Sequence, residues 1–162
     1  MLVSGILLGT LSGLAVGRTW RPLAALQIRW LPLLIAGLIA RAVAPFVPPA
    51  EFALYVTALA ATTGVALVNV RLVGALLVAL GSALNLVVVV LNGGMPVDAA
   101  AVVVAGATMP GDALHVMLGD AARLAWLADV IPVGLFRAVY SLGDICIAVG
   151  GFMVPFVLLV RR

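Results

Sequence analysis

The sequence contains very little charge. Only 9% of its 162 residues are charged, whereas 65% are hydrophobic. Soluble domains carry about 25% charged residues, because polar side chains must cover their surface in water. This chain has too few polar side chains to do so, and we therefore expect it to fold within a lipid bilayer.

Lysine is absent and cysteine occurs once. The nine basic residues are all arginines and lie scattered between apolar runs, so no basic surface for nucleic acid is expected. Cys146 alone allows no intramolecular disulfide and no cysteine-based metal site, and we interpret it as a small buried residue. Nucleophile motifs, phosphate-binding loops and paired carboxylates are also missing, so neither catalytic residues nor a cofactor is predicted.

Long apolar runs dominate what is present. They predict an all-α fold, a polytopic membrane helix bundle that forms one domain over residues 1–162. The first run lacks the basic start of a signal peptide, and we expect it to be retained as a span. Residues 18–30, with Trp20 and Trp30, are typical of an interfacial segment. The five predicted spans cover approximately residues 2–16, 31–47, 52–68, 72–91 and 136–160.

Four glycines recur at four-residue spacing in the first span. Gly5, Gly9, Gly13 and Gly17 would form one helix face without side chains. Such a face allows another backbone to approach closely. It is expected either to pack inside the bundle or to contact another membrane subunit.

Residues 92–134 contain regularly placed acids between short apolar segments. Asp98, Asp112 and Asp120 are interpreted as N-caps of three short helices, of which Gly106 and Gly119 would end the first two. The predicted helices cover residues 99–105, 113–118 and 121–128. Their apolar residues predict a lid of amphipathic helices on the outer face of the membrane.

The arginines predict the orientation. With the amino terminus outside, five spans place six arginines in inner segments: Arg18, Arg21, Arg29, Arg71, Arg161 and Arg162. The outer loops then hold most of the acids, Glu51, Asp98, Asp112, Asp120 and Asp129, together with Arg123 and Arg137. Because cytoplasmic loops are enriched in basic residues, the carboxy terminus is predicted to be cytoplasmic. The predicted location is the bacterial cytoplasmic membrane.

Three polar side chains fall inside the predicted spans. Arg41 and Asn85 would lie roughly 9 Å below the outer boundary, and Asp144 roughly 12 Å below it. Burying charge in a membrane is costly, so we predict that Arg41 and Asp144 form an ion pair, with Asn85 and Asn92 nearby. In the alternative, Arg41 extends to the lipid head groups and Asp144 lies at a shallower boundary.

His115 raises the question of a metal. With Asp112 and Asp120 it could supply three ligands on short helices, but a surface histidine is the preferred interpretation. No metal site is predicted.

Several segments together resemble a known family. They are Asn92–Val97 (Asn-Gly-Gly-Met-Pro-Val), residues 127–132 (Leu-Ala-Asp-Val-Ile-Pro), residues 141–145 (Ser-Leu-Gly-Asp-Ile) and the turn at 69–72 (Asn-Val-Arg-Leu). In these the chain is similar to a bacterial family of small multi-span membrane proteins defined only as a domain of unknown function. The resemblance implies no activity, but it implies that the outer loop and Asp144 belong to one site.

Two hypotheses about function follow. The first is a non-catalytic structural or accessory subunit of a larger membrane complex, which would expose the glycine face to a partner. The alternative is a protein that binds or transports a lipid or small solute through the polar residues of the outer half. It would contain a cavity that reaches Arg41 and Asp144. The lipid bilayer is the partner common to both.

Overall fold

The computed structural model describes residues 1–17, 19–112 and 114–161. It contains α1 (Leu2–Val16), α2 (Arg21–Ala24), α3 (Leu31–Val43), α4 (Glu51–Val68), α5 (Ala75–Asn92), α6 (Ala99–Val104) and α7 (Leu142–Val160). Short 3-10 turns occupy Ala44–Phe46, Pro48–Ala50, Ala125–Leu127 and Gly134–Phe136. Two small sheets pair β1 (Met95–Val97) with β2 (His115–Met117) and β3 (Ile131–Val133) with β4 (Ala138–Tyr140).

Within the described residues, three helices are long and apolar enough to cross a membrane. They are Pro48–Val68, Ala75–Asn92 and Leu142–Val160. Helix Leu2–Val16 and the helix Leu31–Phe46 are apolar but shorter than a usual span. The prediction of an all-α membrane helix bundle is thus confirmed only in its coarse form, since the protein is mainly helical and has helices apolar enough to cross a membrane but also contains small sheets, and the number of five spans is not confirmed.

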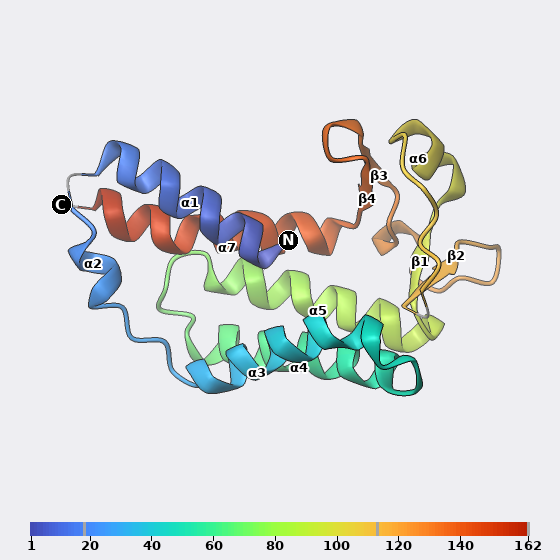
Figure 1. The fold of residues 1–162 in the computed structure, drawn as a ribbon, viewed down its shortest axis with the longest axis horizontal. Helices are drawn as coiled ribbons and strands as arrows, with labels where there is room; N and C mark the ends of the chain where they lie inside the picture. Colours follow the sequence, from blue (N-terminus) through green and yellow to red (C-terminus); the bar gives the residue numbers. More distant parts are fainter. Residues whose placement is uncertain (18, 113, 162) are drawn as a thin grey trace.

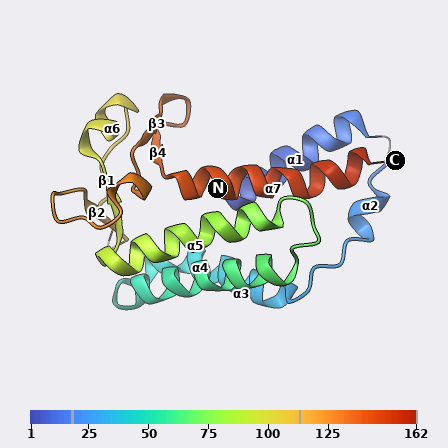
Figure 2. The same cartoon turned by 180° about the vertical axis from the view of Figure 1, so that it is seen from behind.

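The long helices are arranged side by side in the order α1, α7, α5, α4, α3 (Figures 1 and 2). Helix α7 runs antiparallel to α5, α5 to α4, and α4 to α3, whereas α1 runs parallel to α7 (Figure 1). The first and last long helices of the sequence are therefore neighbours. Helix α1 starts beside the N-terminal half of α7, since Gly5 lies against Ala148.

The glycine face of α1 packs on α7 of the same chain. A Cβ atom at Gly5 would overlap the Ala148 carbonyl oxygen, and one at Gly9 would overlap that of Phe152. A Cβ atom at Gly13 would overlap the Leu159 side chain, and one at Gly17 would overlap the Leu159 carbonyl oxygen. The four glycines thus allow two backbones to touch within the bundle, which is the use expected of small residues in membrane helices.

The segment between α5 and α7 is not the predicted lid of three helices. The helix after Asp98 is present as α6, and the Asp98 side chain accepts a hydrogen bond from the backbone N–H of Ala100. The helix predicted after Asp112 is wrong. The Asp112 carboxylate accepts the N–H groups of Leu114 and His115, and this turn leads the chain into β2.

The helix predicted over residues 121–128 is also wrong. The Asn92 side chain accepts the N–H of Arg123 at 2.8 Å and donates to its carbonyl oxygen at 3.0 Å. These backbone groups are then not available to a helix. Only the short turn Ala125–Leu127 remains.

The last span begins later than predicted. Residues 131–140 form the β3–β4 hairpin, in which Ile131 pairs with Tyr140, and α7 starts only at Leu142. The hairpin is as apolar as a helix would be, so hydropathy alone merges the two. A Ser-x-x-Asp capping box, Ser141 to Asp144, marks the true start of α7.

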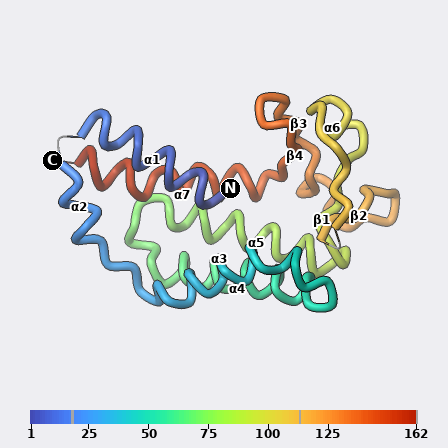
Figure 3. The backbone as a smooth tube through the Cα atoms, viewed as in Figure 1, coloured from blue at the N-terminus to red at the C-terminus, as the bar shows by residue number. Residues whose placement is uncertain are grey.

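Most of the acids lie at one end of the bundle, which also carries Arg41, Arg123 and Arg137, and four other described arginines lie at the opposite end. Arg21, Arg29, Arg71 and Arg161 lie at the end where α1 and α7 finish, while the strands and α6, with most of the acids, lie at the other (Figure 3). Arg18 and Arg162 lie outside the described residues. We call the second end the acidic end.

Candidate functional site: a polar cavity at the acidic end

The Asn92–Val97 segment builds one wall of this end. Gly93 adopts φ +70° and ends α5, and the N–H of Gly94 donates to the Val89 carbonyl at 3.0 Å. The chain then continues into β1, where Met95 is buried. This positive φ lies in the left-handed region that favours glycine, and Gly93 provides it.

Strand β1 also positions an aspartate that sequence analysis placed in a loop. The Asp129 N–H donates to the Pro96 carbonyl at 2.9 Å, and the Asp129 carbonyl accepts the Asp98 N–H at 3.0 Å. Pro96 has no N–H to offer, but this pairing needs only its carbonyl. Both the N–H and the carbonyl group of Asp129 are therefore hydrogen-bonded to the β1 segment.

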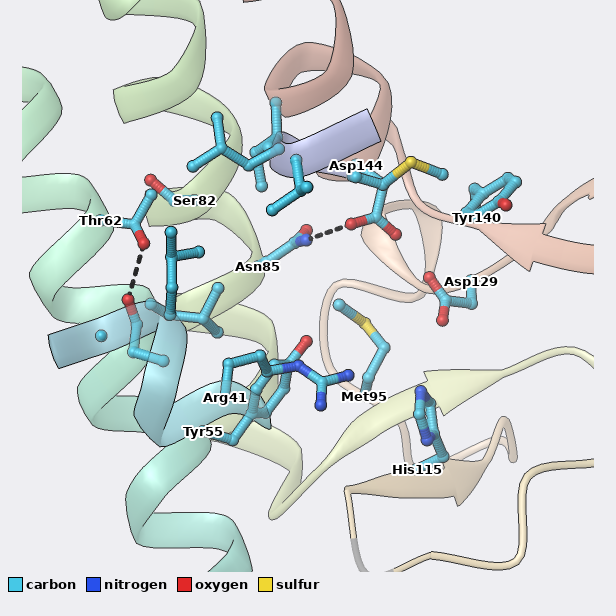
Figure 4. A pocket seen from close by; sticks show the side chains of 18 of the residues that line it. Arg41, Tyr55, Thr62, Ser82, Asn85, Met95, His115, Asp129, Tyr140 and Asp144 are labelled. Carbon is cyan, nitrogen blue, oxygen red and sulfur yellow. Dashed lines mark hydrogen bonds between the residues drawn. The ribbon is translucent and has the colours of Figure 1, made fainter. Parts of the chain in front are cut away.

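A cavity of about 340 Å³ lies between these strands and the helices. Its size falls within the range of small-ligand sites, roughly 300–1,000 Å³. Met95, Leu59 and Ile147 contribute apolar surface. Its polar lining comes from all the long helices except α1 and from the acidic-end segment: Arg41, Tyr55, Thr62, Ser82, Asn85, His115, Asp129, Tyr140 and Asp144 (Figure 4).

Asn85 connects α5 to the start of α7. Its amide Nδ2 donates to Asp144 Oδ1 at 3.1 Å, and its Oδ1 accepts the Ser141 hydroxyl at 3.0 Å. The Ser141 Oγ in turn accepts the Asp144 N–H at 3.0 Å. A Cβ atom at Gly143 would overlap the Asn85 amide, so a glycine is required for this approach.

The predicted Arg41–Asp144 ion pair is wrong. Arg41 is exposed, and its guanidinium lies 4.8 Å from the centre of the Tyr55 ring, a cation–π contact. Asp144 lies in the first turn of α7 instead of deep in a span. This position at the start of the helix agrees with the shallower placement of Asp144 that the sequence analysis gave as the alternative, and the membrane boundary itself stays a prediction. Both side chains nevertheless line the same cavity.

Asp129 is the most deeply buried acid of the cavity. It is 6% exposed, and its Oδ1 has no hydrogen-bond partner among the described residues. Its carboxyl group points into the cavity, toward the side where Asp144 lies (Figure 4). Burial and, secondly, the charge of Asp144 raise the pKa of Asp129 to about 8. Burial and the charges of Asp144 and Asp129 likewise raise the pKa of Tyr140.

His115 lines the cavity as well and is not simply a surface histidine. Its Nδ1 lies 2.6 Å from Asp112 Oδ1, within hydrogen-bond distance. Asp112 thereby fixes the orientation of the imidazole ring. Across residues 1–17, 19–112 and 114–161, no three His, Cys, Asp or Glu side chains are grouped to hold a metal ion.

Asn92 does not belong to the cavity. Its side chain binds the Arg123 backbone and, through Nδ2, the Val88 carbonyl at 2.8 Å. Of the four predicted site residues, Arg41, Asn85 and Asp144 are brought together, and Asn92 instead holds the segment that leads to Asp129. The outer loop and Asp144 do share the cavity, through Met95 of the loop.

Sequence analysis missed Asp129, His115, Tyr55 and Tyr140 as lining residues. Asp129 carried a usable signal, since it is a single acid flanked by Leu127-Ala128 and Val130-Ile131. An acid with apolar neighbours on both sides is expected to be buried and to need a partner. The two tyrosines carried no comparable signal.

These features define the chain as a helical protein with membrane-length apolar helices and a polar cavity at the acidic end of its bundle. The chain belongs to a family of unknown function, DUF5317, whose model matches residues 23–156. The expected membership of an uncharacterised family is thereby confirmed. A comparison with curated proteins and one with solved structures found no match.

Proposed function

We propose that the protein binds a small zwitterionic ligand, either a free solute or a lipid head group, in the cavity at the acidic end. The observation that carries the proposal is the Asp129 carboxyl group, which is buried, lacks a hydrogen-bond partner on Oδ1 and points into the cavity. An uncompensated polar group of this kind costs roughly 1–3 kcal/mol, so it requires a reason other than stability. A ligand that donates hydrogen bonds would satisfy it.

The two kinds of charge in the cavity indicate the ligand's chemistry. Asp129 and Asp144 favour a group that is cationic and donates hydrogen bonds, such as a primary ammonium. Arg41 has no carboxylate partner among the described residues, and its guanidinium fork suits a phosphate or carboxylate. A ligand with an ammonium and an anionic group would use both.

The accessory-subunit hypothesis has lost its main support. It relied on an unexplained glycine face, and that face contacts α7 of the same chain. The absence of familiar catalytic motifs agrees equally well with a binding protein. Binding is therefore the function that the cavity supports best, and assembly with other subunits stays a prediction.

The membrane placement is proposed on charge. We place the end with Arg21, Arg29, Arg71 and Arg161 on the cytoplasmic side, since basic residues are retained there. With Leu2–Val16 and Leu31–Phe46 also crossing the membrane, the amino terminus and the cavity would face outside. The proposed membrane is the bacterial cytoplasmic membrane.

Three probes test the proposal by calorimetry on the full chain in detergent. Ethanolamine carries only the ammonium, glycerol 3-phosphate only the anion, and glycerophosphoethanolamine both. We expect the zwitterion to bind at least tenfold more tightly than either fragment. Asp129→Asn should weaken the binding of ethanolamine and of the zwitterion. Arg41→Gln should weaken the binding of glycerol 3-phosphate and of the zwitterion.

Asp120→Asn is the matched control, because Asp120 is an exposed acid of the same segment that does not line the cavity. It should leave all three affinities unchanged. If no probe binds at millimolar concentration, or if Asp129→Asn binds each probe as the unaltered chain does, the proposal is wrong.

A further inference from the structure

An apolar groove adjoins the polar cavity. It encloses about 470 Å³ and runs between α1, the N-terminal half of α7 and the β3–β4 hairpin. Leu8, Phe136, Ile145, Val149 and Phe152 line it, and Ser4 is the one lining residue besides Tyr140 with a polar side chain. A polar ligand alone would gain nothing from such a surface.

The groove and the cavity meet at shared residues. Tyr140 and Met1 line both of them. From Tyr140 the groove follows α7 from Ile145 to Phe152, a distance of about 10 Å along the helix axis. The polar part therefore lies at the end of the bundle, and the apolar part extends from it toward the middle of the spans.

We propose that the groove and the cavity form one site for a single-chain amphiphile, with a zwitterionic head in the cavity and an aliphatic chain in the groove. This inference depends on the proposed function and deepens it by naming the ligand class. Three features of the groove support this occupant: its continuity with the cavity, its change from polar to apolar lining, and its direction along the helices. A lipid has the same order of polarity along the same axis.

The groove is open on the side from which a lipid would enter. Leu8, Phe136, Ile145 and Val149 are exposed, and in a membrane-embedded bundle they face the bilayer. An amphiphile can therefore place its chain in the groove from the side and leave its head at the acidic end. No passage through the bundle is needed.

The experiment uses lysophosphatidylethanolamine with a photoreactive diazirine in the middle of its chain. The full-length protein is embedded in nanodiscs of phosphatidylglycerol, a lipid without an ammonium group, and the cross-linked residues are mapped by mass spectrometry. We expect cross-links at Leu8, Val149 and Phe152. Excess glycerophosphoethanolamine should suppress them, since it competes for the head position alone.

Two variants distinguish binding of the lipid head group in the cavity from binding of the aliphatic chain in the groove. Asp129→Asn should lower the yield of cross-links in the groove at least tenfold, because it weakens binding of the lipid head group in the cavity. Val149→Trp should lower them equally by filling the groove, while the affinity for glycerophosphoethanolamine stays unchanged. Val87→Trp on α5 is the matched control, because Val87 is 47% exposed, Val149 is 45% exposed, and only Val149 lines the groove.

The outcomes distinguish the two proposals. If glycerophosphoethanolamine binds in the Asp129-dependent manner but the cross-links are absent from the groove or survive Val149→Trp, the amphiphile inference is wrong and the proposed function stands. If cross-links spread evenly over the exposed faces of α5 and α7 and resist the competitor, the groove holds ordinary bilayer lipid and the inference is wrong. If glycerophosphoethanolamine does not bind at all, both proposals fail.

Discussion

Asn85 holds the Asp144 carboxylate on one side of its amide and the Ser141 hydroxyl on the other. The two bonds measure 3.1 Å and 3.0 Å and bridge 59 and 56 residues of sequence. Asn85 is 2% exposed, so water does not replace either bond. This amide is the polar link between the middle of the bundle and the residues that form the cavity.

The first prediction concerns that link. Asn85→Ala should destabilise the protein by about 2 kcal/mol, because it leaves the buried Ser141 hydroxyl and one Asp144 oxygen without their partner. A double-mutant cycle of Asn85→Ala with Asp144→Asn, followed by thermal unfolding in detergent, should give a coupling free energy of about 1 kcal/mol or more. The matched cycle of Arg41→Gln with Asp144→Asn should be additive, since these two residues form no ion pair. Coupling in the second cycle but not the first would contradict the geometry.

The second prediction concerns pH and stability. The folded-state pKa of Asp129 is about 8 and its ordinary value is 3.8, so the folded state holds a proton that the unfolded state releases between these pH values. The contribution of Asp129 to stability should therefore be largest at low pH and should fall by up to about 1.4 kcal/mol per pH unit until the pH passes about 8. Thermal unfolding of Asp129→Asn should lack this slope. An equal slope in the variant would assign it to another group.

The third prediction concerns pH and binding. An ammonium group binds the ionised form of Asp129, whose fraction rises about tenfold per pH unit below the pKa. The affinity for glycerophosphoethanolamine should therefore increase between about pH 6 and pH 8 and then level off. Calorimetry in buffers of different ionisation enthalpy should show that binding releases a proton at pH 7. A pH-independent affinity would mean that the ammonium group does not contact Asp129.

The fourth prediction concerns the contact between α1 and α7. Gly9→Ala should destabilise the protein by about 1–3 kcal/mol, because the added methyl group overlaps the Phe152 carbonyl oxygen in a packed contact. Gly64→Ala is the matched control within a helix. An added Cβ there meets nothing within 4 Å, so the better helix propensity of alanine should stabilise the protein by up to about 1 kcal/mol. Thermal unfolding of both variants measures the two changes in stability. An unchanged stability of Gly9→Ala would contradict the close contact between the α1 and α7 backbones.

Hydropathy and glycine spacing predicted the helical bundle well. These signals are local, and the apolar runs at 52–68 and 72–91 correspond closely to α4 and α5. Hydropathy could not separate the β3–β4 hairpin from α7, because both are apolar. The Ser141 to Asp144 capping box contained that information and would have shown that Asp144 lies in the first turn.

The candidate site was predicted only in part. Arg41, Asn85 and Asp144 were identified because polar residues stand out in apolar spans. The position of Asp129 depends on its backbone pairing with Pro96, a contact across 33 residues that no periodicity reveals. The same holds for Asn92, whose partner is the backbone of Arg123, 31 residues away. Side-chain to backbone bonds of this kind leave no pattern in the sequence.

The parallel contact between α1 and α7 has a consequence for biosynthesis. Because α1 precedes α7 in the sequence, ribosomes make α1 before α7, and the glycine face of α1 lacks its packing partner until α7 has been made. Tyr140, Asp144 and the groove wall also arrive only with the final part of the chain. A chain that lacked α7 would leave the glycine face of α1 without its packing partner and the cavity without Asp144.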